Sequence, residues 1–137
     1  MKRLLCVCVV ACLVLLGGCG IGAVTITPEQ NTFPIDTEYI PVVWRNGTLG
    51  RIMFGEAFTL QHWDDGEWVE LEPVNGLLFY LIGYGLRPGQ SRRHTYAIGW
   101  AELTPGRYRI AASFSFDRDR PIGPDDLHQI YAEFEVS

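Results

Sequence analysis

Apolar and polar residues alternate with a period of two along two long stretches, and this pattern restricts the possible folds more than any other feature. The clearer stretch is 107–116, and the second is 129–136. No segment after Cys19 has apolar residues at the spacing of about three to four that an amphipathic helix requires. This part of the chain is therefore predicted to be all-β. One side of the first stretch carries Tyr108, Ile110, Ala112, Phe114 and Phe116, and the other carries Arg107, Arg109, Ala111, Ser113 and Ser115.

Two dipeptides between the apolar segments predict hairpin turns. Asn46-Gly47 and Asp65-Gly66 suit such turns because both central positions need a positive φ. A two-residue loop at Asp65-Gly66 pairs Trp63 with Trp68, whereas a three-residue loop would reverse part of this arrangement. With the two-residue loop the tryptophans share one face, and the opposite face carries Phe58, Leu60, His62, Val69 and Leu71.

Two further segments, 86–89 and 103–106, have the sequence Leu-x-Pro-Gly. Proline at the first central position and glycine at the second predict a type II turn in each. The second segment leads directly into the alternating stretch 107–116. Such an entry is typical of a tyrosine corner, in which a tyrosine hydroxyl bonds back to the upstream backbone. The corner is predicted to consist of Leu103, Pro105, Gly106 and Tyr108.

Short strands separated by turns at intervals of about 8–12 residues predict an immunoglobulin-like β-sandwich, with two antiparallel sheets and about seven to nine strands. Pro41 lacks a backbone donor, so its strand is expected at a sheet edge or with a bulge. All four cysteines lie at or before residue 19, so apolar packing must hold the core without a disulfide. A polar loop is expected at 117–127. The expected strands are 22–27, 37–45, 51–54, 57–63, 67–72, 77–83, 91–98, 107–116 and 129–136.

The order of these turns and strands resembles a bacterial Ig-like domain, of the kind found as a single module in small bacterial lipoproteins. The resemblance covers nearly all of the chain after Cys19, and its motifs are turn and core residues. It therefore implies a fold but no activity, because fold alone does not determine function. The motifs are Asn46-Gly47, Phe58-Thr59-Leu60, Asp65-Gly66-Glu67-Trp68, Leu86 to Gly89, Pro105 to Ile110, and Ala132 to Val136.

The first residues have the features of a secretion signal. Lys2 and Arg3 precede thirteen apolar residues, 4–16, which are too few to span a bilayer but suit a signal peptide. The next residues complete a segment that resembles the lipobox of bacterial lipoproteins, Leu16-Gly17-Gly18-Cys19. That resemblance implies cleavage before Cys19 and diacylation of its sulfur, and two acyl chains suffice for stable anchoring. The alternatives are an ordinary secretory signal with a chance cysteine, or a membrane-buried anchor.

The expected organisation is a signal peptide at 1–18, a lipid anchor and short linker at 19–21, and the sandwich at 22–137. Gly20 rather than aspartate follows the cysteine, which implies outer-membrane delivery in a double-membrane cell. In a single-membrane cell the protein would face outward from the plasma membrane. Removal of residues 1–18 leaves 119 residues, with nine arginines against 16 acidic residues, for a formal net charge of −7. This acidic balance argues against nucleic acid as a partner.

The sequence contains no recognisable catalytic or phosphate-binding motif. His62, His94 and His128 fall on three separate predicted strands, so they do not predict a metal site. The loop 117–126 has carboxylates suited to calcium, but its two arginines would oppose a cation. We therefore expect neither enzymatic activity nor a cofactor.

The expected function is non-catalytic binding at the cell envelope, by a monomer anchored to membrane lipid through Cys19. Trp63 and Trp68 are the candidate binding patch if they pair on the outer face, and an exposed aromatic patch suits a protein or glycan partner. The alternative is a proteinase inhibitor that presents loops at the cell surface, because small Ig-like inhibitors also use Leu-x-Pro-Gly turns. Arg120-Pro121 is too short a match to support that alternative.

Overall fold

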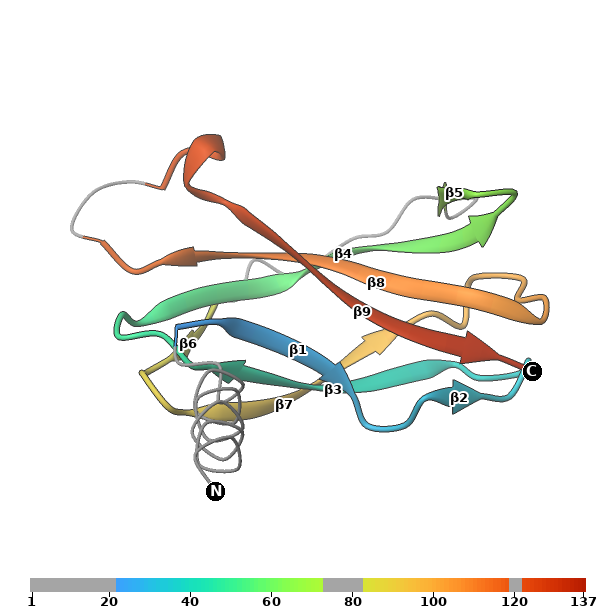
Figure 1. The fold of residues 1–137 in the computed structure, drawn as a ribbon, viewed down its shortest axis with the longest axis horizontal. Coiled ribbons are helices and arrows are strands. Elements are labelled where there is room, and N and C mark those ends of the chain that lie inside the picture. Colours follow the sequence, from blue (N-terminus) through green and yellow to red (C-terminus); the bar gives the residue numbers. More distant parts are fainter. Residues whose placement is uncertain (1–21, 73–82, 119–121) are drawn as a thin grey trace, which may run out of the picture.

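The computed structural model describes residues 22–72, 83–118 and 122–137, which form β-strands and one short 3-10 helix (Figure 1). The elements are β1 (Val24–Pro28), β2 (Thr32–Phe33), β3 (Tyr39–Asn46), β4 (Ile52–Asp64), β5 (Glu67–Leu71), β6 (Gly83–Leu86), β7 (Ser91–Ala97), β8 (Gly106–Phe116), η1 (Pro124–Asp126) and β9 (His128–Val136).

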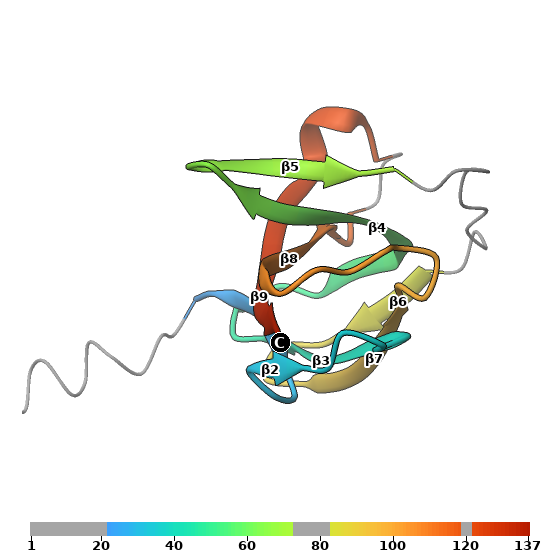
Figure 2. The ribbon, with the colours of Figure 1, turned by 90° about the vertical axis from the view of Figure 1, so that its right-hand side faces the viewer.

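The strands form two sheets that pack face to face (Figures 1 and 2). The smaller sheet has the order β1-β3-β7, and the larger has the order β2-β9-β8-β4-β5, with β6 paired to β4. All pairs are antiparallel except β2 with β9. The predicted immunoglobulin-like sandwich is thereby confirmed.

Aromatic side chains from both sheets fill the core. Trp44 on β3 stacks on Phe54 of β4, with ring centroids 4.2 Å apart and planes 9° from parallel. Its indole N–H donates to the Tyr96 hydroxyl at 3.2 Å, which satisfies its buried polar atom. Trp44 is fully buried and is therefore the core tryptophan, whereas Trp63 is 38% exposed. Burial of each large apolar side chain stabilises the fold by about 1.5–3 kcal/mol.

Of the two loop lengths that the sequence allowed, the β4–β5 hairpin has the two-residue loop. Asp65 has φ of 47° and Gly66 has φ of 82°, as this turn requires. Trp63 lies opposite Trp68. Because the side-chain period in a strand is two, the tryptophans lie on the outer face and the apolar set with Leu60 lies on the inner face.

Two local predictions, a hairpin at Asn46-Gly47 and an edge or bulged strand at Pro41, are wrong. Asn46-Gly47 forms no hairpin, because β3 and β4 belong to different sheets; the buried Asn46 amide instead donates to Gly50 O at 2.7 Å and Leu86 O at 3.0 Å. Pro41 is in the central strand of the smaller sheet, just past the end of β1, and its carbonyl accepts from Glu29 N. Because Pro41 lies past the end of β1, the absence of a backbone N–H at this proline removes no hydrogen bond from the paired part of β1 and β3.

The strand boundaries differ from the expectation at three places. The segments 51–54 and 57–63 form one strand, β4, whose pairing with β8 shifts between Phe54 and Phe58. The two-residue strand β2 was not predicted. Most of the expected strand 77–83 lies outside the described residues, with Gly83 beginning β6.

The two Leu-x-Pro-Gly segments differ in conformation. At the first, Gly89 has φ of 78° and Gln90 N donates to Arg87 O, in agreement with the predicted type II turn. At the second, Gly106 has φ of 154°, so the predicted type II turn is wrong. A Cβ at Gly106 would lie 2.9 Å from His62 Nε2, and the position therefore requires glycine.

Tyr108 fastens the start of β8 to the preceding loop. Its hydroxyl accepts a hydrogen bond from Thr104 N at 3.0 Å and donates one to Thr104 O at 2.9 Å. Its ring is buried and stacks on His62 and Phe134, with centroids 4.3 Å and 5.9 Å away. This geometry is that of a tyrosine corner, with Leu103 buried beside it in the core.

Replacement of Tyr108 by phenylalanine should lower the free energy of unfolding by about 0.5–1.5 kcal/mol, because it removes the two hydrogen bonds between the Tyr108 hydroxyl and the Thr104 backbone. Urea denaturation of the domain checks this expectation. Tyr39→Phe is the matched control, because Tyr39 is 58% exposed and should change stability little. Equal unfolding midpoints for both variants would contradict a stabilising corner.

His94 on β7 is a buried titratable side chain at the contact between the sheets. It is 9% exposed, and its ring packs against Phe54, Tyr84 and Tyr96. Its Nε2 lies 3.5 Å from the Glu56 carboxylate and makes no hydrogen bond with the described residues. Burial lowers the pKa of His94 below its ordinary value; nearby Glu56 opposes this effect and Arg92 adds to it. The imidazole is therefore neutral at pH 7.

The lowered pKa of His94 makes stability depend on pH. The unfolded chain binds a proton at His94 near the ordinary pKa of about 6.5, whereas the folded protein binds it only at lower pH. The unfolding free energy should therefore fall as the pH drops from about 7.5 to about 5.5. We expect His94→Gln to reduce this fall, as measured by urea midpoints. His128→Gln, at an exposed site, should keep it, and an equal fall in both variants would contradict the assignment.

Candidate functional site

The outer face of the larger sheet carries a cluster of aromatic and arginine side chains, here named the aromatic–arginine cluster. It consists of Trp63 on β4, Trp68 on β5, Arg107 and Arg109 on β8, and Tyr131 on β9. Alternation along each strand turns these side chains away from the core, because inward positions such as Tyr108 and Ile110 occupy the other face. Strand pairing then brings together residues far apart in sequence.

The two tryptophans meet at the hairpin end of the cluster. Their ring centroids are 5.1 Å apart, with an edge-to-face angle of 66°. The Arg107 guanidinium lies 5.3 Å from each of the two rings, and it donates a hydrogen bond to the Glu133 carboxylate at 2.9 Å. Attraction between the cation and the ring faces holds this arrangement at the surface.

Arg109 is held between two aromatic rings. Its guanidinium carbon lies 3.8 Å from the Tyr131 ring centroid and 4.3 Å from that of Trp68. Its Nε donates to the side-chain oxygen of Gln61, which lies opposite it on β4. The guanidinium therefore has a fixed position although it lies on the solvent side of the sheet.

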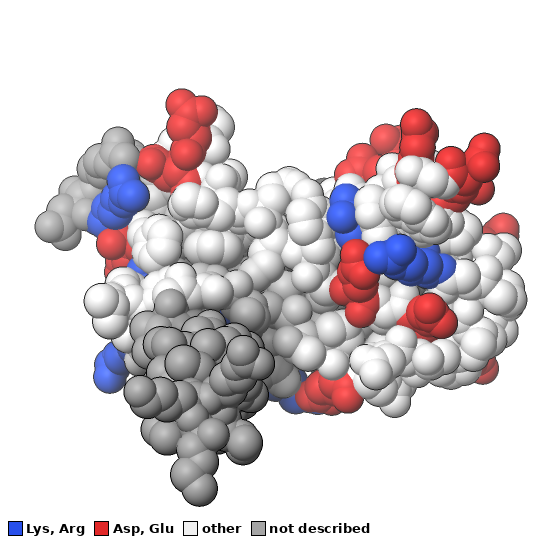
Figure 3. Space-filling model, in the orientation of Figure 1, with Lys and Arg blue, Asp and Glu red and all other residues white. Residues whose placement is uncertain are grey.

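Acidic side chains surround the two arginines. Glu133 and Glu135 on β9 and Glu70 on β5 share the outer face with the cluster. Figure 3 shows acidic side chains on both sides of basic ones at the end of the molecule where the β4–β5 hairpin lies. The site combines aromatic surface and guanidinium donors with an acidic border, so it can stack on a ligand and donate hydrogen bonds to it.

The β4–β5 hairpin extends beyond the smaller sheet. In Figure 2, β5 lies at the edge of the larger sheet farthest from β3 and β7. Val69 points to the inner face by register, yet it is 43% exposed. The hairpin that carries both tryptophans is therefore accessible from both sides.

Of the cluster, sequence reasoning identified only Trp63 and Trp68 as candidate site residues. It placed Arg107 and Arg109 on the outward side of their strand but did not bring them to the tryptophans. Tyr131 was missed as a site residue, although alternation within 129–136 also turns it outward. The outward-facing residues of adjacent strands would have identified the cluster. Which strands are adjacent, however, could not be read from the sequence.

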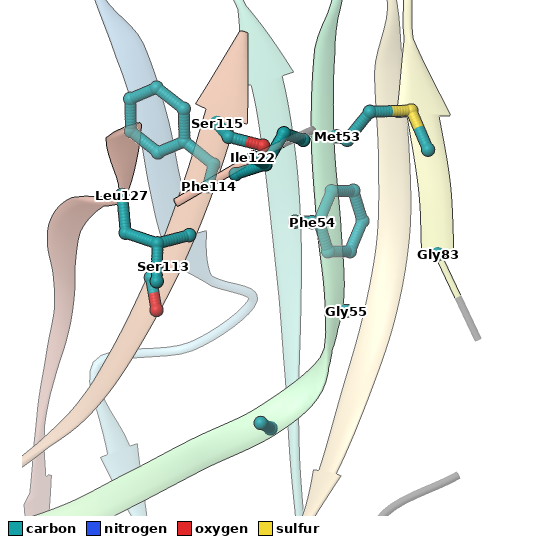
Figure 4. A pocket seen from close by; sticks show the side chains of 10 residues that line it. Met53, Phe54, Gly55, Gly83, Ser113, Phe114, Ser115, Ile122 and Leu127 are labelled. Atoms are coloured by element: carbon teal, nitrogen blue, oxygen red, sulfur yellow. The ribbon is translucent and has the colours of Figure 1, made fainter. Parts of the chain in front are cut away.

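A pocket of about 350 Å³ lies on the larger sheet between β4 and β8 (Figure 4). Met53 and the β8–β9 loop residues Ile122 and Leu127 line it, and among its described lining residues the polar side chains are Ser113 and Ser115. Gly83 and Ile122 directly follow the undescribed residues 73–82 and 119–121. Because its border lies partly outside the described chain, we assign it no function.

The histidines do not form a common site. His62 stacks on Tyr108 inside the sandwich, and exposed His128 stacks on Phe114. Within 22–72, 83–118 and 122–137, no group of three or more His, Cys, Asp or Glu side chains could hold a metal ion. In the same ranges, no helix is long and apolar enough to cross a membrane. Leu16, Gly17, Gly18 and Cys19 lie outside the described residues.

Comparison with known proteins agrees with the fold and its turn motifs. No curated protein matches the chain. The family described as Bacterial Ig-like domain matches residues 21–135, which include all nine strands except the last residue of β9. The chain therefore belongs to the bacterial Ig-like domain family.

Proposed function

We propose that this protein is a lipid-anchored, non-catalytic binding module on the outer side of a bacterial cell envelope, and that it contacts its partner through the aromatic–arginine cluster. Membership of the bacterial Ig-like family supports a non-catalytic module. The charged start, short apolar run and lipobox-like segment ending at Cys19 support export and lipid attachment.

The observation that carries the binding role is the composition of the exposed cluster. Tryptophan, tyrosine and arginine are the residue types most enriched among the strongest contributors to protein interfaces. Here Trp63, Trp68, Tyr131 and two arginines lie together on a solvent-facing sheet, although a well-packed core is available on its other face. The rings and guanidinium groups hold one another in place, which reduces the entropy lost on binding.

The start of β1 and the cluster lie at opposite ends of the sandwich. β1 begins at Val24, five residues after Cys19, so at most about 18 Å of chain joins the lipid to the domain. Figure 1 shows that β1 begins at the end opposite the β4–β5 turn. A short tether would therefore keep the domain close to the membrane while the cluster faces away from it.

Apart from the Leu-x-Pro-Gly turns, no feature of the described residues favours the inhibitor alternative. Arg120 and Pro121 lie outside the described residues. The cluster lies on a sheet face, whereas an inhibitor of that kind would present loops.

Replacement of Cys19 by serine should move the protein from the membrane fraction to the soluble fraction and abolish incorporation of labelled palmitate, because the acceptor sulfur is lost. Fractionation of expressing bacterial cells and palmitate labelling measure this effect. Cys12→Ser is the matched control, because Cys12 lies inside the proposed signal and should have no effect. Membrane retention and labelling of the Cys19 variant would refute lipid anchoring.

The binding role is tested with the domain 20–137 immobilised and exposed to solubilised bacterial envelope. Replacement of Trp63 and Trp68 by alanine should weaken retention of its partner roughly 30-fold or more, since the change removes two interface aromatics. Tyr39→Ser is the control, because Tyr39 is an exposed aromatic on the other sheet. Circular dichroism verifies folding. Equal retention by a folded double variant would exclude the cluster as the contact surface.

A further inference from the structure

Arg109 differs from the other members of the cluster in the state of its hydrogen-bond donors. Its guanidinium carbon lies close to the rings of Trp68 and Tyr131, and Gln61 accepts a hydrogen bond from its Nε. Among the described residues, no acceptor and no carboxylate bonds to its two terminal nitrogens. A guanidinium has five N–H donors in its plane, so four of them remain available at its edge.

The ion pairing between β8 and β9 explains why the terminal donors of Arg109 are free. Glu133 lies directly opposite Arg109 in the β8–β9 register, but its carboxylate accepts a hydrogen bond from Arg107 instead. The ion pair with Arg107 therefore occupies the nearest acidic side chain. Arg109 is left as a cation whose position is fixed by rings and an amide rather than by a counter-charge.

We propose that the free edge of Arg109 binds a single carboxylate on a protein partner, a side chain of Asp or Glu with basic residues beside it. The inference rests on the proposed binding role and names the chemical group that the same face recognises. A planar guanidinium and a carboxylate form two parallel hydrogen bonds in one plane, and this geometry is strong and directional. The Trp68 and Tyr131 rings hold the guanidinium in place, and its terminal donors have no acceptor among the described residues.

The charges around Arg109 favour a protein over a polyanion. Glu70, Glu133 and Glu135 share the face, and the chain after residue 18 has a formal net charge of −7. A polymer with many negative charges would meet repulsion from the acidic side chains on both sides of Arg109. A lone carboxylate flanked by lysine or arginine complements both Arg109 and its acidic border.

The test uses two blocked peptides, Ac-Lys-Ala-Glu-Ala-Lys-amide and the same peptide with Gln for Glu, and the folded domain 20–137, whose two sheets are complete within it. Nuclear magnetic resonance of the arginine Nε–H groups follows the titration. The Glu peptide should shift the Arg109 signal with a dissociation constant on the order of 1 mM. The Gln peptide should bind at least about tenfold more weakly, because it lacks the charge.

Arg109→Lys keeps the charge but removes the planar pair of donors, and it should weaken binding of the Glu peptide about tenfold. Arg45→Lys is the matched control, because Arg45 is an exposed arginine on β3 of the other sheet. It should bind like the unmodified domain. The wild-type Arg109 signal reports the contact without any substitution, so an unfolded variant would not obscure the result.

Three outcomes would overturn the proposal. They are equal binding of the Glu and Gln peptides, tighter Arg109-dependent binding of polyglutamate than of the single-carboxylate peptide, and Arg109-dependent pairing of two copies without peptide binding. If the two peptides bind equally but the tryptophan double variant still loses its envelope partner, the carboxylate assignment fails and the binding role stands.

Discussion

The contact between Trp44 and Phe54 is the interaction on which the rest of the structure depends. Trp44 comes from the smaller sheet and Phe54 from the larger, so their stacked rings join the two layers. No cysteine follows residue 19, so no disulfide can join the two sheets as it does in many small sandwiches. Apolar burial must therefore hold the sheets together. Such a core is sensitive to volume, since truncation of a buried aromatic costs about 3–5 kcal/mol.

The aromatic contacts of Trp44 lie toward one end of β4. Trp44, Phe54 and Phe114 pack beside one another around the start of β4 and the end of β8, while the other end of β4 continues into the hairpin with β5. The smaller sheet has three strands, and among the described residues none of them faces β5 (Figure 2). Leu71 still packs against the core, whereas Trp63 and Val69 nearer the turn are exposed; cation–π contacts with Arg107 and Arg109 fix the outer face of the hairpin.

Sequence reasoning succeeded where one short-range rule determines the structure. Asp65-Gly66 specifies its turn locally, and that turn sets the register that pairs Trp63 with Trp68. The alternation within 107–116 likewise identified β8. Asn46-Gly47 has the same local preference, but tertiary contacts prevail there, because the buried Asn46 amide bonds to Gly50 and Leu86.

Such short-range rules do not predict the order of the strands in the sheet. Turn residues and alternation show which residues point outward from a strand, but not which strand lies beside it. Arg109 meets Trp68 and Tyr131 only because β8 lies between β4 and β9, and β5 continues the sheet beyond β4. The sequence therefore predicted only the part of the site that lies within one hairpin, Trp63 and Trp68.

Arg109 is both fixed on the outer face and able to bind a ligand, although an ion pair that stabilises the fold would also neutralise the cation. A surface ion pair with Glu133 would stabilise the fold by at most about 1 kcal/mol and would also neutralise the cation. Two rings and Gln61 instead hold the guanidinium in place and leave its terminal donors unpaired. In a chain whose acidic residues outnumber its basic ones, a fixed cation without an acidic partner is a specific feature of this face. Its immobilisation by uncharged groups is what would allow an incoming carboxylate to bind without displacing one already present.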